Sequence, residues 1–581
     1  MKPHILLSLC PLALAACATL PQPSAAPAAP PRIGQLDSAQ VGVQGLVSAA
    51  DPRAAEAGAE MLRLGGSATD AAIATMLALT VVEPQSSGIG GGGFLLMGDA
   101  AGNVDTIDGR ETAPAAATGD WFMRGGKPME FADAQPGGKS VGVPGSMRLV
   151  ALAHRSHGKL AWKTLFGPAI RLARNGFAVT PRLNHALSDG VATGGFDAAA
   201  RAIFYDSAGT PRAVGTTIRN PALATTLERI AARGAGDFYS GANAREIASK
   251  VSAAPHNPAP MTVADITAYD AKARPAVCGS YRGYRICGMG PPSSGATTVQ
   301  AILGQLERFD LKALGPQSPV AWHLIAESER LAYADREKYL ADGDFIKVPV
   351  AGLTDPSYLA QRGELISPDR TLALVQPGTP PGARLIMGAA GKTPEEHGTS
   401  HFVVVDRSGN SASYTSTIES AFGSGIMVGG YYLNNELTDF SFVPDVGGIP
   451  VANRVEGGKR PRSSMSPTLI YGPDGKLKLA LGAAGGATII VQVAKAIIGV
   501  IDWGLPAQQA IALPVLFAPG GNTVMVEKDS ALEAMIPALK ALGHADVQSR
   551  PMPLKANAIE RVGDRWVGAA DPRSEGAAVA Q

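Results

Sequence analysis

The residues of this sequence best suited to covalent chemistry lie at His397-Gly398-Thr399-Ser400-His401. The Thr399 hydroxyl is a weak nucleophile and needs an adjacent base. If the peptide bond between Gly398 and Thr399 were cut, the freed α-amino group would titrate at roughly 7.7–8.0, close to the working pH at which a general base is most effective. One residue would then supply both nucleophile and base. The alternative is an ordinary loop before a strand, and the surrounding sequence has to decide between the two.

The residues after Thr399 predict a β-hairpin. Positions 401–406 form an apolar, largely β-branched run, positions 407–410 a turn that contains glycine, and positions 411–417 a second alternating run. We expect Thr399 to open the edge strand of a new subunit once the bond before it is cut.

Other polar residues are suited to holding a small substrate with charged ends. Arg110 carries a guanidinium fork that can bind a carboxylate through two points, although a single arginine is most often structural. Glu436 and Asp439 lie three residues apart and would share one side of a helical turn. Ser463 and Ser464 present hydroxyls from a predicted loop.

Two glycine-rich segments have different expected roles. Residues 88–93 lead into a buried strand without a Gly-Lys-Ser/Thr motif, so they predict close backbone packing rather than a phosphate site. Gly485 and Gly486 precede an apolar helix predicted at 488–501 and could present two backbone N–H groups to an oxyanion. A purely structural role is the alternative for this pair.

The composition is typical of a well-buried soluble protein. Hydrophobic residues make up 45% of the chain and charged residues 17%, and the formal net charge is +1. Without a basic excess or a run of Lys and Arg, the sequence gives no support for a nucleic-acid partner.

The N-terminus predicts export. After Lys2, an apolar run of about ten residues is typical of a bacterial secretory signal and is too short to span a bilayer. The segment Leu14-Ala15-Ala16-Cys17 resembles a lipobox, so we expect residues 1–16 to be a lipoprotein signal peptide and Cys17 to be lipidated. The protein would then be anchored at the periplasmic face of a membrane. A plain signal peptide is the alternative. Residues 17–38, rich in Pro and Ala, predict a stiff tether.

The two remaining cysteines, Cys278 and Cys287, bracket a predicted hairpin that turns at Arg282-Gly283. Counting outwards from the turn places them opposite each other in a non-hydrogen-bonded pair, within disulfide range. A disulfide and two free thiols both remain open at this point. Without a nearby pair of histidines, these cysteines do not make a metal site.

Taken together, these motifs resemble the γ-glutamyltranspeptidases, members of the N-terminal-nucleophile hydrolases, from about Gly45 to Gly576. Any one motif would be a weak signal, but eight of them occur in the family's order: Gly90–Phe94, Asp108–Pro114, Gly142–Gly145, Glu327–Asp335, the Thr399 hairpin, Asn434–Phe440, Arg460–Pro467 and Asp571–Ser574. The resemblance implies an α/β fold, the four-layer αββα sandwich of stacked antiparallel sheets flanked by helices. It also implies a large subunit, residues 39–398, and a small catalytic subunit, residues 399–581, that form a heterodimer without a cofactor or metal.

Carried over by position, the resemblance implies a cleavage site and catalytic roles for four residues. Cleavage between Gly398 and Thr399 would free Thr399 as the nucleophile, and Thr417 looks like the residue that orients it. Gly485 and Gly486 match the oxyanion hole.

The same resemblance implies a clamp for a γ-glutamyl group. Arg110, Ser463 and Ser464 match the positions that hold the α-carboxylate, and Glu436 and Asp439 match those that hold the α-ammonium. A γ-glutamyl amide such as glutathione would be positioned for attack by Thr399. Its acyl group would pass to water or to an amine acceptor.

Three departures from the family pattern bear on the substrate. Glu419 stands where the family usually has Asn, beside the ammonium site, and there it would either strengthen cation binding or take up a proton. Residues 441–459, which resemble the lid, look shortened and contain no Tyr, and alanines flank Gly485 and Gly486 where the family commonly has Ser-Pro and Ser-Arg. Two alternatives stay open, a related amidohydrolase such as a cephalosporin (glutaryl) acylase and an inactive envelope lipoprotein.

Overall fold

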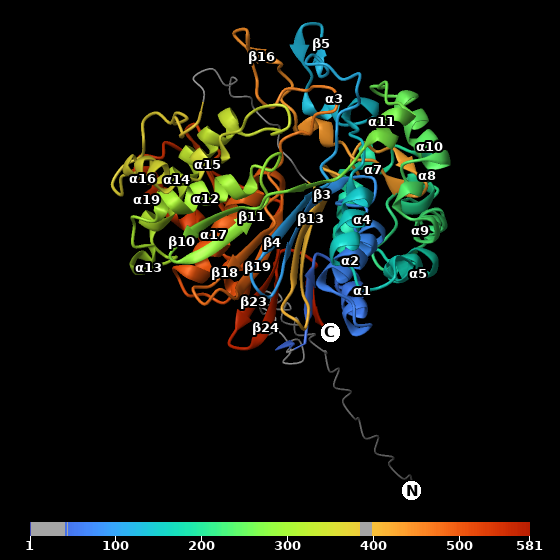
Figure 1. Ribbon diagram of the computed structural model, residues 1–581, viewed down its shortest axis with the longest axis horizontal. Helices are drawn as coiled ribbons and strands as arrows, with labels where there is room; N and C mark the ends of the chain where they lie inside the picture. The colour runs from blue at the N-terminus through green and yellow to red at the C-terminus, as the bar shows by residue number, and fades with distance from the viewer. Residues whose placement is uncertain (2–40, 43, 384–397) are drawn as a thin grey trace.

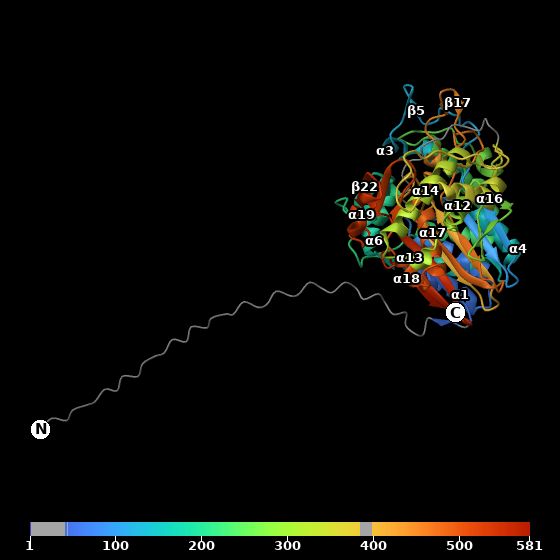
Figure 2. The same ribbon diagram turned by 90° about the vertical axis from the view of Figure 1, so that its left-hand side faces the viewer.

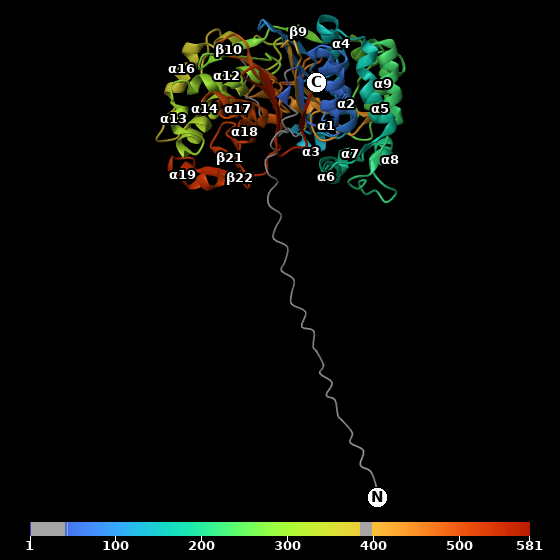
Figure 3. The ribbon, with the colours of Figure 1, turned by 90° about the horizontal axis from the view of Figure 1, so that it is seen from below.

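The structure, a computed structural model, describes residues 1, 41–42, 44–383 and 398–581. Two seven-stranded antiparallel sheets stack face to face, and helices cover both outer faces (Figures 1 and 3). The predicted four-layer αββα sandwich is therefore confirmed. Apart from Met1, the predicted signal peptide, the lipidation site Cys17 and the tether all lie outside the described residues.

The sheet that carries the nucleophile has the order β25-β2-β12-β13-β3-β4-β9. Its strands are β2 (Leu46–Ala49), β3 (Gly92–Gly98), β4 (Val104–Asp108), β9 (Lys272–Arg274), β12 (Ser400–Val405), β13 (Ser411–Thr417) and β25 (Ala577–Ala580). β12 and β13 form the predicted hairpin, with Val403 opposite Ser413. However, β12 lies between β2 and β13 in the interior of the sheet, so the prediction of an edge strand was wrong.

The second sheet has the order β1-β24-β23-β19-β18-β11-β10. Its strands are β1 (Val41–Gly42), β10 (Val277–Tyr281), β11 (Tyr284–Gly288), β18 (Thr468–Tyr471), β19 (Leu477–Ala484), β23 (Lys555–Val562) and β24 (Arg565–Ala570). In the hairpin β10–β11, Cys278 pairs with Cys287, and a disulfide joins them with the Cα atoms 4.1 Å apart. Of the two alternatives left open by the sequence, the structure has the disulfide.

One helical layer packs on the nucleophile's sheet and the other on the second sheet (Figure 1). The first contains α1 (Pro52–Arg63), α2 (Ala68–Val82), α4 (Ser146–His157), α5 (Gly167–Asn175) and α9 (Pro221–Arg233). The second contains α12 (Gly295–Leu306), α14 (Pro319–Tyr339), α16 (Pro356–Glu364), α17 (Ile489–Ile501) and α18 (Ala507–Ala512). No helix in the described ranges 44–383 and 398–581 is long and apolar enough to cross a bilayer.

Smaller elements complete the two sides. The remaining helices are α3 (Phe131–Ala134), α6 (Pro181–Asp189), α7 (Val191–Gly194), α8 (Ala198–Phe204), α10 (Gly241–Ser252), α11 (Val263–Ala268), α13 (Leu311–Leu314), α15 (Val350–Leu353) and α19 (Ile536–Ala541). The remaining strands are β5 (Met123–Arg124), β6 (Lys127–Pro128), β7 (Phe177–Ala178), β8 (Thr217–Ile218), β14 (Met427–Val428), β15 (Tyr431–Tyr432), β16 (Asp445–Val446), β17 (Ile449–Pro450), β20 (Leu516–Phe517), β21 (Thr523–Glu527) and β22 (Asp546–Arg550).

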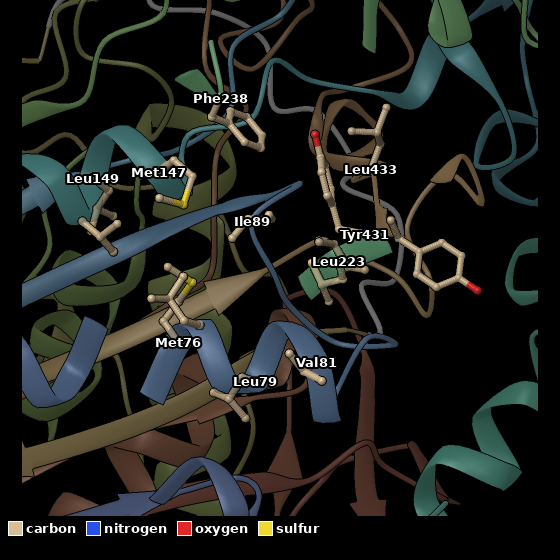
Figure 4. Packing of buried hydrophobic residues seen from close by; sticks show 14 of the residues in the cluster. Met76, Leu79, Val81, Ile89, Met147, Leu149, Leu223, Phe238, Tyr431 and Leu433 are labelled. Carbon is tan, nitrogen blue, oxygen red and sulfur yellow. The ribbon is translucent and has the colours of Figure 1, made fainter. Parts of the chain in front are cut away.

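Helix α2 leads the chain into the site, and its sequence explains its bounds. Ser67 and Asp70 form a capping box that satisfies the first backbone N–H groups. Every residue of α2 is buried, in keeping with its apolar sequence. Figure 4 shows Met76 of this helix pointing toward Met147 of α4, whereas Leu79 points away from α4; all three belong to one hydrophobic cluster. After α2, the carbonyl of Ser86 accepts from the backbone N–H of Thr399 at 3.1 Å, directly before β12.

The predicted lid, residues 441–459, contains the hairpin β16–β17, which projects from the same end of the molecule as the hairpin β5–β6 (Figures 1 and 2). Phe442 stacks on Phe122 with ring centroids 4.5 Å apart, which joins the bases of the two hairpins. Asn453 donates to the carbonyl of Asp439 at 2.7 Å and accepts from the backbone N–H of Arg462 at 2.9 Å. The hairpin is therefore fastened at its base to two segments that carry candidate binding residues.

Candidate active site

The hydroxyls of Thr399 and Thr417 meet at the end of the hairpin β12–β13. Thr399 Oγ1 lies 3.0 Å from Thr417 Oγ1, and the backbone N–H of Glu419 donates to Thr417 Oγ1 at 2.8 Å. Both threonines are buried. The sequence paired these two residues by resemblance, and the register of the hairpin brings them together because each stands at the same end of its strand.

The backbone at the predicted cleavage site is strained. Thr399 has φ of 98°, in the left-handed region that a β-branched residue rarely adopts. A side chain on Gly398 would collide with the carbonyl oxygen of Glu419, which itself has φ of 74°. Such conformations cost roughly 1–3 kcal/mol each and persist only where the surroundings impose them. The backbone is thus strained at the candidate nucleophile, directly after the predicted cleavage site.

The glycine-rich segment 88–93 packs its backbone against the site. A Cβ on Gly91 would collide with the carbonyl oxygen of Thr417, and one on Gly90 with the carbonyl oxygen of Tyr432. The prediction of close backbone packing is confirmed. The absence of side chains here lets β3 pair with β13 up to Thr417 itself.

Arg110 lies in a buried ion-pair cluster with the two predicted ammonium-site residues. Its guanidinium group donates to the carboxylates of Glu436 and Asp439, and Nη2 also donates to the carbonyl of Arg462 at 3.0 Å. Glu436 and Asp439 share the 3₁₀ turn Glu436–Asp439, as their spacing predicted. Although burial alone would lower the pKa of Arg110, these carboxylates raise it above its ordinary value.

The cluster holds more carboxyl groups than positive charge. Glu111, which was not among the predicted site residues, is fully buried beside Arg110, and burial raises its pKa to about 8. Burial also raises the pKa of Glu436 well above its usual range, and that of Asp439 above its own, against the opposing effect of Arg110. A cationic group entering this cluster would be attracted by these carboxyl groups and would favour their charged form. The chemistry of the cluster therefore favours a bound ammonium.

Ser463 and Ser464 lie on the loop that Arg110 reaches through backbone carbonyls. Ser464 Oγ accepts from Arg336 of α14 at 2.7 Å, and Ser463 Oγ accepts from the backbone N–H of Met465 at 3.1 Å. The fork of Arg110 is directed at the carboxylates of Glu436 and Asp439 in this intact chain, whereas the sequence predicted that it would face a substrate carboxylate. The candidate clamp residues therefore lie in one region. Their ion pairs and hydrogen bonds with one another could not be predicted from local sequence patterns.

Gly485 and Gly486 adopt conformations that favour glycine, with φ of 128° and 61°. The hydroxyl of Thr488 donates to the carbonyl of Gly485 at 2.7 Å, and Thr488 is the N-cap residue of α17. Among the residues that the structure describes, no carbonyl accepts from the backbone N–H of either glycine. Two such N–H groups are what an oxyanion hole requires.

Contacts between the two sheets place this glycine pair at the nucleophile's end of the sandwich. A side chain on Gly482 would meet the ring of His401, and Ser413 Oγ donates to the carbonyl of Leu481 at 3.2 Å. Residues later in β19 therefore lie next to residues earlier in β12, so the C-terminal end of β19 faces the N-terminal end of β12. The strand β19 ends at Ala484, beside the start of β12 at Ser400.

Glu419 follows Thr417 closely and points into a polar cluster. Its carboxylate accepts from the side chains of Ser420 and Asn435. Its negative charge is one of the causes that raise the pKa of Glu436. The residue that departs from the family pattern is thus electrostatically connected to the cluster around Arg110. Within the described residues, no group of three or more His, Cys, Asp or Glu side chains is arranged to hold a metal ion.

Comparison with known proteins agrees with this geometry. The family model for gamma-glutamyltranspeptidase matches residues 54–581. The chain is 36% identical over 562 residues to a glutathione hydrolase proenzyme of Bacillus subtilis, covering 95% of this chain and 94% of that protein. It is 34% identical over 565 residues to an acylase proenzyme of a Pseudomonas species, covering 96% and 97%.

Among solved structures, a cephalosporin acylase from Bacillus halodurans superposes with a TM-score of 0.83 at 26% identity. The match covers 96% of this chain and 99% of that one. The ordered motifs, the stacked sheets and the paired threonines all agree with the match over residues 54–581. The chain belongs to the γ-glutamyltranspeptidase family.

Proposed function

We propose that this protein is a self-processing γ-glutamyl hydrolase and transferase that acts on glutathione-like amides. The observation that carries the proposal is the contact of the Thr399 and Thr417 hydroxyls, where the backbone of Thr399 is strained, beside a carboxyl-rich cluster around Arg110. Family membership and the glutathione hydrolase relatives support the same reaction.

Self-cleavage begins with attack of Thr399 Oγ1 on the carbonyl carbon of Gly398. The C–N bond breaks, the Thr399 nitrogen takes up the hydroxyl proton, and an ester joins the two residues. Water then hydrolyses the ester and leaves a carboxylate on Gly398 and a free α-amino group on Thr399. The products are the proposed large subunit, ending at Gly398, and the small subunit, beginning at Thr399.

The same hydroxyl then attacks the γ-carbonyl of the substrate. The free α-amino group accepts the proton, the N–H groups of Gly485 and Gly486 stabilise the oxyanion, and the amine leaves with the proton. Water or a second amine attacks the resulting acyl-enzyme and regenerates the Thr399 hydroxyl. The carboxyl groups of Glu436 and Asp439 receive the substrate's α-ammonium, while Arg110, Ser463 and Ser464 receive its α-carboxylate.

A glutaryl amidohydrolase is the second candidate, because the acylase relative and the cephalosporin acylase structure match over nearly the whole chain. The two candidates differ at one group, since a glutaryl chain lacks the α-ammonium that a γ-glutamyl chain carries. Glu419 and the short lid are the departures from the family pattern that favour the acylase, whereas an ionised Glu419 beside the cluster would favour the substrate with the cation.

Two measurements test the proposal. Denaturing electrophoresis with N-terminal sequencing should give two pieces, the smaller beginning at Thr399, and Thr399→Ala should stay uncut and inactive. Hydrolysis of a γ-glutamyl anilide should exceed that of the matched glutaryl anilide in kcat/KM. A single uncut wild-type chain would contradict the mechanism, and a preference for the glutaryl compound would establish the acylase instead.

We also propose export with a lipid anchor at Cys17. Support comes from the apolar run after Lys2, the lipobox-like segment and the disulfide of Cys278 and Cys287, which is typical of an oxidising compartment. Metabolic labelling with a palmitate analogue tests the anchor, and Cys17→Ala should abolish the label.

A further inference from the structure

A buried ion pair connects the two sides of the proposed cut. Glu83 is the C-cap residue of α2, which packs on the nucleophile's sheet. Lys555 is the first residue of β23 in the second sheet. Lys555 Nζ lies 2.9 Å from Glu83 Oε2 and 3.2 Å from Oε1, and both side chains are at least 96% buried. Because Glu83 precedes Gly398 and Lys555 follows it, the pair would join the two subunits after cleavage.

Both members of the pair hold the residue next to the nucleophile. Ser400 Oγ donates to Glu83 Oε2 at 2.5 Å and lies 3.3 Å from Lys555 Nζ. Ser87 Oγ also donates to Ser400 Oγ, at 3.2 Å. Since Ser400 is the first residue of β12, this group fixes the point from which Thr399 extends.

The loop after α2 also holds the backbone of the nucleophile. The carbonyl of Ser86 accepts from the backbone N–H of Thr399 at 3.1 Å and from that of Ile418 at 3.3 Å. The N–H of Ser86 in turn donates to the carbonyl of Glu83 at 2.9 Å. The backbone carbonyl of Glu83 therefore supports the nitrogen of Thr399 through Ser86, and the side chain of Glu83 holds the hydroxyl of Ser400.

The charges of the pair depend on each other. Burial alone would raise the pKa of Glu83, but Lys555 and Arg182 hold it below its usual range. Burial lowers the pKa of Lys555 to about 8, so the ammonium is still charged at neutral pH. Removing Lys555 leaves the buried carboxylate of Glu83 with Arg182 as its remaining ion-pair partner, whose Nε lies 3.6 Å from Oε1. Losing a buried partner in this way is more costly than losing an exposed pair.

We propose that Glu83 and Lys555 are positioning residues for Thr399, acting through Ser400. They hold the hydroxyl of Thr399 against Thr417 during self-cleavage and keep the new N-terminus in the site afterwards. The role is most important after cleavage, because the peptide bond no longer restrains Thr399. The inference rests on the proposed function, in which Thr399 is the nucleophile.

The first experiment compares Lys555→Met with Lys555→Arg and with Lys478→Met. Lys478 forms an ion pair with Glu560 between β19 and β23, the strand that Lys555 begins, and is a matched control away from Ser400. For Lys555→Met we expect slow self-cleavage and a kcat about 100-fold lower, the cost of roughly 1 Å of misplacement. KM should be unchanged, since the cluster around Arg110 is intact. Lys555→Arg should recover much of kcat, and Lys478→Met should match the wild type.

Two further variants keep the test decisive if Lys555→Met does not fold. The double variant Glu83→Gln/Lys555→Met removes both charges together, and Ser400→Ala removes the shared hydroxyl. Both should fold and show the same selective loss of kcat. Wild-type kcat in these variants, or an equal loss in Lys478→Met, would overturn the inference. An uncut, inactive wild-type chain would instead refute the proposed function.

Discussion

Replacing Thr417 with valine tests whether its hydroxyl organises the site. Valine keeps the shape of the side chain but removes the oxygen that contacts Thr399 Oγ1 at 3.0 Å and accepts from the N–H of Glu419 at 2.8 Å. Leaving that buried N–H without a partner costs about 1–3 kcal/mol. The lost contact with the Thr399 hydroxyl adds about 1 kcal/mol. The expected total is about 2–4 kcal/mol of unfolding free energy.

The two contributions can be separated on a Thr399→Ala background. There the chain stays uncut and the hydroxyl contact is already absent, so Thr417→Val should cost only the part due to the N–H of Glu419, about 1–3 kcal/mol in urea unfolding. With Thr399 present, self-cleavage followed by gel electrophoresis should be about 100-fold slower, because the hydroxyl is no longer oriented.

Thr417→Ser is the matched control. It retains both hydrogen bonds and loses one methyl group, so it should lose only about 1 kcal/mol and cleave at close to the wild-type rate. Equal cleavage rates for Thr417→Val and the wild type would refute the assigned role. A valine variant as stable as the serine variant on the Thr399→Ala background would refute the energetic reasoning.

Three further outcomes are expected. Burial raises the pKa of Glu111 from an ordinary 4.5 to about 8, so the fold holds a proton that the unfolded chain releases. Stability should therefore fall as the pH rises across that window, and Glu111→Gln should flatten the dependence in urea titrations at several pH values. Gly91→Ala would collide with a backbone carbonyl of β13 and should prevent self-cleavage, whereas Gly236→Ala, with open space around it, should cleave normally on gels. Replacing Cys278 and Cys287 with Ser should lower the unfolding free energy by roughly 2–3 kcal/mol, as expected for a short closed loop, measured without reductant.

Local patterns in the sequence predicted the elements that depend on local interactions. The hairpin 401–417 follows from its alternation and its glycine turn, and the apolar helix predicted at 488–501 forms as α17. The error at β12 has a different origin. Its second partner, β2, comes from residues 46–49, and nothing local to Thr399 indicates pairing with a segment more than 350 positions earlier.

The candidate site likewise contains residues that the sequence predicted and long-range contacts that it did not. The resemblance supplied Arg110, Glu436 and Asp439 as residue types at matched positions, but not their mutual ion pairs in the intact chain. Glu83 and Lys555 were missed, because neither stands in a matched motif and 472 positions separate them. A buried lysine can be recognised as paired only once the fold brings its partner into contact.

The strain at Thr399 connects the fold to the proposed chemistry. Its φ of 98° is a rotation about its own N–Cα bond, defined by the carbonyl carbon of Gly398. Cleavage of the peptide bond between the two residues removes that restraint altogether, so the free energy stored in the backbone is released by the reaction itself. The groups that contact Thr399, the hydroxyl of Thr417 on β13 and the carbonyl of Ser86 in the loop after α2, do not include the bond to be cut, so we expect them to hold the freed residue. A site built this way favours its own cleavage and afterwards retains the geometry that the acyl-transfer step requires.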